Sequence, residues 1–99
     1  MKKDLSYYFN QILNLKPSLR EQYFVSEISI FGSYARGEEK TGSDLDLLVS
    51  FMKTPDLFDL ASLNSFLEKE LGVKIDLVPN QNLKPRIAQN ILTEKIDVI

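Results

Sequence analysis

The chain has 99 residues, 43% hydrophobic and 26% charged, a composition typical of a folded globular domain rather than of a disordered chain. Twelve basic and fourteen acidic residues give a formal net charge of −2, which argues against a dedicated nucleic-acid binder because such proteins usually carry a strongly basic surface. Cysteine and histidine are both absent, so thiol nucleophiles, thiolate metal sites and histidine bases are excluded. Any metal site must use oxygen ligands, which favour Mg²⁺, Mn²⁺ or Ca²⁺.

A chain of this length has room for one modest core, so we expect a single domain over residues 1–99. Residues 1–13 lack the unbroken apolar stretch of a signal peptide, and no segment reaches the roughly 18 apolar residues of a membrane span. We therefore expect a cytoplasmic protein that does not insert into a membrane.

The first element is an amphipathic helix. Apolar residues recur at helical spacing over residues 4–15, where Tyr7 and Tyr8 lie on or beside the apolar stripe and are expected to serve helix packing. We expect this helix to stop at Lys16-Pro17, because the residue before a proline avoids helical conformation.

Two strands and a polar loop come next. Residues 24–31 alternate in the manner of a strand, and residues 36–43 hold two glycines and four charges, as an exposed loop does. A second strand over 45–51 follows so closely that we expect it to pair antiparallel with the first.

The longest helix of the chain is expected after the second strand. Thr54 is its expected cap, Pro55 and Asp56 are expected in its first turn, and Gly72 ends it. Its expected buried stripe consists of leucines and one alanine, namely Leu57, Leu60, Ala61, Leu63, Leu67 and Leu71.

The last part of the chain predicts a third strand over 73–79, a short helix over 85–93 and a tail, 94–99, that adds an edge strand. Helices and strands in this order predict a small α+β fold, an α/β sandwich.

Three aspartates interrupt these apolar strands. Asp44 and Asp46 are two residues apart at the start of the second strand, so their side chains point the same way, and Asp76 interrupts the third strand. Clustered carboxylates repel one another and drive one member to protonate, whereas a divalent cation lets all of them stay ionised. We interpret the three aspartates as metal ligands, against the simpler readings of a solvated strand start for Asp44 and Asp46 and of an edge-strand charge for Asp76.

Gly32 and Ser33 stand where the first strand must turn. Glycine admits the close approach of a phosphate, and the following residues, Ser33 to Arg36, begin a short helix. Phosphate donors beside carboxylate-held metal ions make a site for phosphoryl or nucleotidyl transfer. Ser33 as a mere turn residue is the simpler alternative.

Three basic side chains near this region have a functional and a simpler reading. Arg36 either neutralises phosphate charge or forms a surface ion pair. Lys84 and Arg86 either line a nucleotide or partner surface or belong to a solvated face, and we favour the solvated face.

The spacing Gly32-Ser33, ten residues, then Asp44-Leu45-Asp46 resembles the signature of the polymerase-β-like nucleotidyltransferase superfamily. The fuller stretch GSYARGEEKTGSDLDLLV, with KIDLV downstream, is similar to its minimal nucleotidyltransferase (MNT) branch. The resemblance covers roughly residues 28–90. It implies a polymerase-β-like core in which helices pack on a small mixed sheet.

The resemblance also implies a mechanism. By analogy, Asp44 and Asp46 bind two Mg²⁺ ions, Asp76 binds one near the attacking hydroxyl and serves as general base, and Gly32 and Ser33 hold the β and γ phosphates of ATP. MNT proteins that resemble this chain are commonly antitoxins that transfer AMP from ATP to a tyrosine of a HEPN-domain toxin.

Two classes of function remain open at this stage. The leading hypothesis is a Mg²⁺-dependent protein adenylyltransferase acting as an antitoxin. The alternative is a binding antitoxin that neutralises its partner by occlusion without turnover. Transfer to a small molecule or an RNA end is a third reading, disfavoured because 99 residues leave no room for a second substrate-binding domain.

Overall fold

The computed structural model describes residues 2–99, which form a mixed four-stranded sheet in the order β3-β2-β1-β4. The strands are β1 (Val25–Phe31), β2 (Leu45–Phe51), β3 (Ile75–Pro79) and β4 (Ile96–Asp97). β1 pairs antiparallel with both β2 and β4, and β2 pairs parallel with β3. The predicted antiparallel pairing, the C-terminal edge strand and the α+β class are therefore confirmed.

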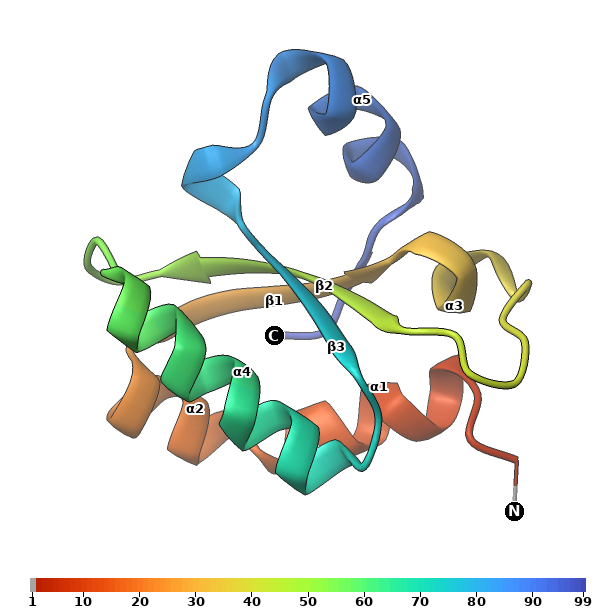
Figure 1. Ribbon diagram of the computed structural model, residues 1–99, viewed down its shortest axis with the longest axis horizontal. Coiled ribbons are helices and arrows are strands. Elements are labelled where there is room, and N and C mark those ends of the chain that lie inside the picture. Colours follow the sequence, from red (N-terminus) through yellow and green to blue (C-terminus); the bar gives the residue numbers. More distant parts are fainter. Residues whose placement is uncertain (1) are drawn as a thin grey trace.

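The helices lie on both sides of this sheet. They are α1 (Leu5–Asn14), α2 (Lys16–Tyr23), α3 (Gly32–Arg36), α4 (Leu57–Leu71) and α5 (Pro85–Glu94), with a 3₁₀ turn, η1 (Asn80–Asn82), before α5. α1, α2 and α4 cover one face, α5 stands on the opposite side, and α3 sits at the end of the sheet between β1 and β2 (Figure 1). Within residues 2–99, no helix is both long and apolar enough to cross a membrane.

The core lies between the sheet and the layer of α1, α2 and α4. Alternate residues of β2, namely Leu45, Leu47 and Val49, are fully buried and belong to one core cluster with Leu63 and Leu67 of α4. Because side chains alternate along a strand, Asp46 projects from the opposite face of the sheet.

The core cluster is contiguous, and the radius of gyration of the chain is 12.7 Å, close to the ~13 Å of a 100-residue domain. The single-domain organisation of residues 1–99 stays a prediction.

The first helix ends before Lys16-Pro17, as predicted, but a second helix that was not predicted follows it directly. Leu15 ends α1, and α2 begins at once, with Pro17 inside its first turn. Proline is tolerated there because the first N–H groups of a helix have no intrahelical partner to lose. The proline thus redirects the chain into a second helix, whose Leu19 is fully buried in the core.

The predicted start of the long helix is wrong. Asp56, not Thr54, caps α4: its carboxylate accepts a hydrogen bond from the Asp59 N–H at 2.7 Å, and the Asp59 carboxylate accepts one from the Asp56 N–H at 3.0 Å. This reciprocal capping box satisfies two N–H groups that would otherwise lack partners. Pro55 and Asp56 consequently precede the helix.

The predicted buried stripe of α4 is correct only in part. Leu63, Leu67 and Leu71 are buried, whereas Leu57 is 84% exposed and Ala61 is exposed as well. At about 100° per residue, both lie more than 100° around the helix from Leu63 and so turn away from the sheet. The other predicted bounds agree with the structure to within two residues.

Candidate active site

The strand register brings two of the three predicted aspartates side by side. Asp46 of β2 pairs with Asp76 of β3, on the sheet face opposite the core layer. Asp44 directly precedes β2 and is half-buried, whereas Asp76 is exposed on the edge strand. The outer face of the sheet therefore carries a carboxylate pair with a third carboxylate close to it in the chain.

The surroundings of Asp46 disfavour its ionised form. Burial, a hydrogen bond shared with Asp76 and the negative charges of Asp76 and Asp44 together raise the pKa of Asp46 to about 6, while the positive charge of Arg36 counteracts them in part. Burial is the largest of these causes, and the nearby carboxylates add to it.

The backbone of Gly32 approaches Asp46 closely. It adopts φ +74°, a left-handed conformation that side chains disfavour, and a Cβ built on it would stand 1.9 Å from Asp46 Oδ2. The Asp46 carboxylate therefore lies directly against the Gly32 backbone, in space that any other residue would fill.

The helix that follows Gly32 is fixed by an aromatic contact. Tyr34 of α3 is buried, and its ring meets that of Tyr8 edge to face with centroids 5.3 Å apart. Burial and the neighbouring Tyr34 raise the pKa of Tyr8 to about 12. The predicted packing role of Tyr8 is confirmed, and this contact anchors the segment that carries Gly32 and the half-buried Ser33 to α1.

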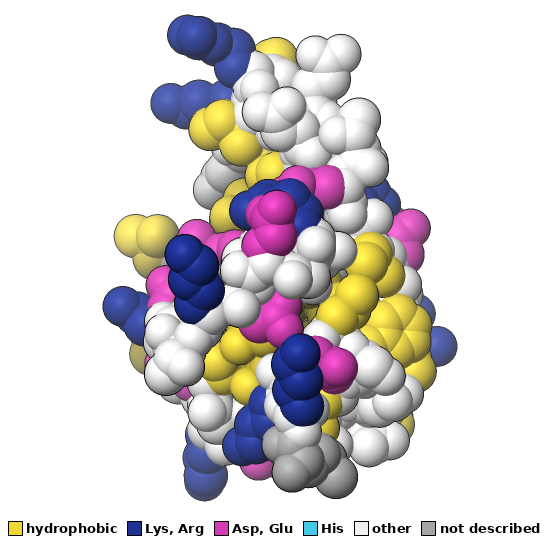
Figure 2. All heavy atoms as spheres, turned by 90° about the vertical axis from the view of Figure 1, so that its right-hand side faces the viewer, with side chains coloured by type: hydrophobic (Ala, Val, Ile, Leu, Met, Phe, Trp, Pro, Cys, Tyr) yellow, Lys and Arg dark blue, Asp and Glu magenta, His cyan; other side chains and the backbone are white. Residues whose placement is uncertain are grey.

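Arg36 and Glu94 form a polar contact that the sequence did not predict. Arg36 Nη1 donates to Glu94 Oε2 at 3.0 Å, Arg36 Nε donates to Glu38 Oε1 at 2.7 Å, and the backbone N–H of Gly32 donates to Glu94 Oε1 at 2.9 Å. The hydrogen bonds of Glu38 and then Glu94 raise the pKa of Arg36. Acidic and basic side chains lie intermingled on the face that carries α3 (Figure 2). The surface ion-pair reading of Arg36 is thus the one that the structure displays.

The predicted metal ligands do not form a complete coordination site. Among residues 2–99, no group of three or more acidic side chains is arranged so that it could hold a metal ion as it stands. The donor set still suits a hard divalent cation, because Asp46 and Asp76 are opposed carboxylates whose repulsion such an ion would relieve. The roles of Asp44, Asp46 and Asp76 as ligands stay predictions.

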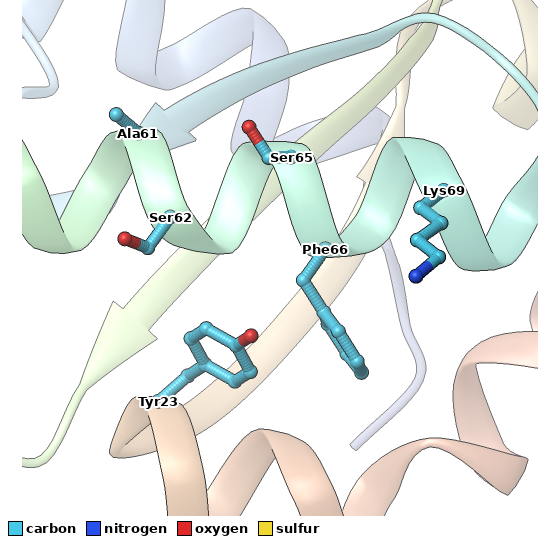
Figure 3. Close-up of a pocket in the computed structure, with 6 residues that line it drawn as sticks. All are labelled: Tyr23, Ala61, Ser62, Ser65, Phe66 and Lys69. Atoms are coloured by element: carbon cyan, nitrogen blue, oxygen red, sulfur yellow. The ribbon is translucent and has the colours of Figure 1, made fainter.

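A separate surface hollow lies away from the aspartates, between α2 and α4. Tyr23 and five residues of α4 line this hollow of about 510 Å³ (Figure 3). The ring centroids of Tyr23 and Phe66 stack there 4.8 Å apart, so the hollow is a seam between packed helices.

Lys84 and Arg86 are exposed at the start of α5, as expected of a solvated face.

The comparison with known proteins decides the family. Residues 12–98 match the model of the nucleotidyltransferase domain. The chain belongs to this family. Protein adenylyltransferase MntA of Thermococcus cleftensis is 46% identical over 83 residues, which are 84% of each chain. The chain is thus an MntA homologue, and the predicted membership of the minimal nucleotidyltransferases is confirmed.

Solved structures confirm the polymerase-β-like nucleotidyltransferase fold. A protein assigned to the minimal nucleotidyltransferases matches with a TM-score of 0.77 and 39% identity, covering 94% of both chains. A toxin–antitoxin structure with AMP-PNP matches at 0.77 and 25% identity, over 92% of this chain and 72% of the other. The complex of tri-AMPylated HEPN toxin with MNT antitoxin from Shewanella oneidensis matches at 0.71 and 22% identity, over 96% and 71%, and shows the same fold.

Proposed function

We propose that this minimal nucleotidyltransferase transfers AMP from ATP to a hydroxyl group, most simply a tyrosine, of a HEPN-type toxin and thereby acts as its antitoxin. The observation that carries the proposal is the in-register pair Asp46 and Asp76, with the Asp46 carboxylate against the backbone of Gly32. MntA of Thermococcus cleftensis is a protein adenylyltransferase, and the AMP-PNP complex of a related toxin–antitoxin pair supports ATP as the substrate.

Each residue of the site has a part in the proposed reaction. The acceptor hydroxyl gives its proton to Asp76 as its oxygen bonds to the α-phosphorus of ATP, the bond from that phosphorus to the β-phosphate oxygen breaks, and pyrophosphate leaves. Gly32 and Ser33 would hold the β and γ phosphates that leave as pyrophosphate. Asp44, Asp46 and Asp76 would hold two Mg²⁺ ions, which supply charge neutralisation for the attacking and leaving oxygens.

The exposed position of Asp76 suits a protein acceptor. Asp76 is on the edge strand β3 and open to solvent, so a docked partner can bring its own hydroxyl to the carboxylate. Binding energy from a protein interface can then do the positioning that a substrate pocket does in larger enzymes.

The test is intact-mass measurement of a candidate HEPN-type toxin after incubation with this protein, Mg²⁺ and ATP. Added AMP units on a tyrosine support the proposal. Asp76→Asn should lower the transfer rate by about 100-fold or more while leaving ATP affinity little changed, because a general base acts in the chemical step. Neutralisation of the toxin with bound nucleotide and no change in mass would instead establish the occluding antitoxin.

A further inference from the structure

Glu94 holds two potential phosphate donors, the Gly32 N–H of the proposed nucleotide site and the guanidinium of Arg36 on the same short helix. Its Oε1 accepts the Gly32 N–H at 2.9 Å, and its carboxylate pairs with Arg36 Nη1 at 3.0 Å and 3.2 Å. These groups are 62 and 58 residues away in the sequence, so the contact is a product of the fold. One side chain from the end of α5 thus engages a backbone donor and a guanidinium of α3.

A phosphate group would need the same two donors, a backbone N–H and a guanidinium. A carboxylate and a phosphate both present acceptor oxygens with negative charge, and both take the N–H groups of a turn and of arginine as their strongest partners. A backbone N–H has one hydrogen to donate, so Gly32 cannot serve Glu94 and a phosphate oxygen at full strength together. Glu94 also places a negative charge where the triphosphate would bring more.

We propose that Glu94 is an internal competitor for the nucleoside triphosphate: it occupies the Gly32 N–H and Arg36 in the nucleotide-free protein and must withdraw when the phosphates bind. The inference rests on the proposed function, because it takes Gly32 and Arg36 as phosphate donors. Glu94 lies outside the nucleotidyltransferase motif and, in this proposal, sets the affinity of the site for nucleotide.

The position of Glu94 allows it to withdraw. It is the last residue of α5, and Ile91 is the single buried residue of that helix. α5 stands apart from the core layer on the other side of the sheet (Figure 1). The chain after it is secured independently, because Val98 N–H donates to the Ile28 carbonyl at 2.8 Å. Movement of the Glu94 side chain alone therefore leaves Ile91 and the backbone contact of Val98 in place.

The test measures ATP binding by calorimetry, with Mg²⁺ present, for the full chain and three variants. Glu94→Gln keeps the shape of the side chain but removes its charge, and we expect it to bind ATP about 10-fold more tightly. Asp97→Asn is the charge-matched control: Asp97 accepts a hydrogen bond from Ser29 Oγ at 2.6 Å and pairs with Lys95, away from Gly32. Its ATP affinity should stay within twofold of wild type.

Glu38→Gln separates competition at Gly32 from a general loss of negative charge, since Glu38 pairs with Arg36 alone. A gain for Glu94→Gln that clearly exceeds those of Glu38→Gln and Asp97→Asn supports the proposal, including the case in which wild type shows no binding and Glu94→Gln does. Equal gains for Glu38→Gln and Glu94→Gln, or unchanged or weaker binding by Glu94→Gln, overturn it and leave the proposed function standing if wild type binds ATP. Absence of binding by all four folded proteins overturns both.

Discussion

Substitution of Gly32 tests the central feature of the site, the carboxylate held against a glycine. In Gly32→Ala the new Cβ would stand 1.9 Å from Asp46 Oδ2 and 2.8 Å from Asp46 Cγ, so the carboxylate must leave its place. The left-handed backbone of an alanine costs ~1–2 kcal/mol, and forcing Asp46 from its rotamer adds ~0.5–1.5 kcal/mol. We expect a loss of ~2–3 kcal/mol, which lowers Tm by roughly 10–20 °C in a domain of this size.

Gly37→Ala supplies a matched control for this experiment. Gly37 has φ +71°, nearly the value of Gly32, but nothing lies within 4 Å of its built Cβ, so only the backbone cost of ~1–2 kcal/mol applies. The assay is thermal melting with and without Mg²⁺-ATP at 100 times its Kd, which stabilises a binding-competent fold by ~2.7 kcal/mol. Gly37→Ala should keep this gain and Gly32→Ala should lose it. If Gly32→Ala melts no lower than Gly37→Ala and keeps the ligand-induced gain, the inferred contact between Gly32 and Asp46 is wrong.

Two further predictions concern stability. The pKa of Asp46 is raised from its usual 3.8 to about 6, so the folded state binds more protons than the unfolded state between these values, and metal-free stability should fall as pH rises from about 4 to 6. Asp46→Asn should flatten this slope. In EDTA at pH 7 it should also stabilise the fold by ~1 kcal/mol, since solvent access reduces the ~3 kcal/mol that the full pKa shift would represent. Chemical denaturation across pH measures both effects, and an unchanged slope would contradict the carboxylate repulsion. Asp56→Ala should cost ~1 kcal/mol by removing the cap of α4, whereas Thr54→Ala should leave Tm unchanged; equal melting of the two variants would show that the cap is misassigned.

The sequence predicted those features that depend on local pattern. Alternation identified β1 and β2, the short connection identified their antiparallel pairing, and the spacing of Gly32 and Asp46 indicated the motif. All three aspartates were expected to lie together, and the parallel register of β2 and β3 places Asp46 and Asp76 side by side, with Asp44 just before β2. The period of two in a strand also fixes which face Asp46 occupies, opposite the fully buried leucines of β2.

The errors arose where several local solutions were open. Pro17 is compatible with a helix end and with a first helical turn, and the choice depended on whether Leu19 could reach the core. Thr54 and Asp56 are both capping residues, and only the position of the helix on the sheet selects Asp56. Glu94 could not be found from spacing, because its partners lie 62 and 58 residues away. The one signal it offers is an acidic residue at the end of the last helix, just before the apolar tail.

The edge-to-face contact of Tyr8 and Tyr34 gives this protein an intrinsic optical probe. The chain has four tyrosines and no tryptophan, so its near-ultraviolet circular dichroism and its fluorescence come from tyrosine and phenylalanine alone. Tyr8 and Tyr34 are the two that are buried, and together they join α1 to the segment that begins at Gly32. Rearrangement of that segment when a ligand binds should thus be followed in the unlabelled protein.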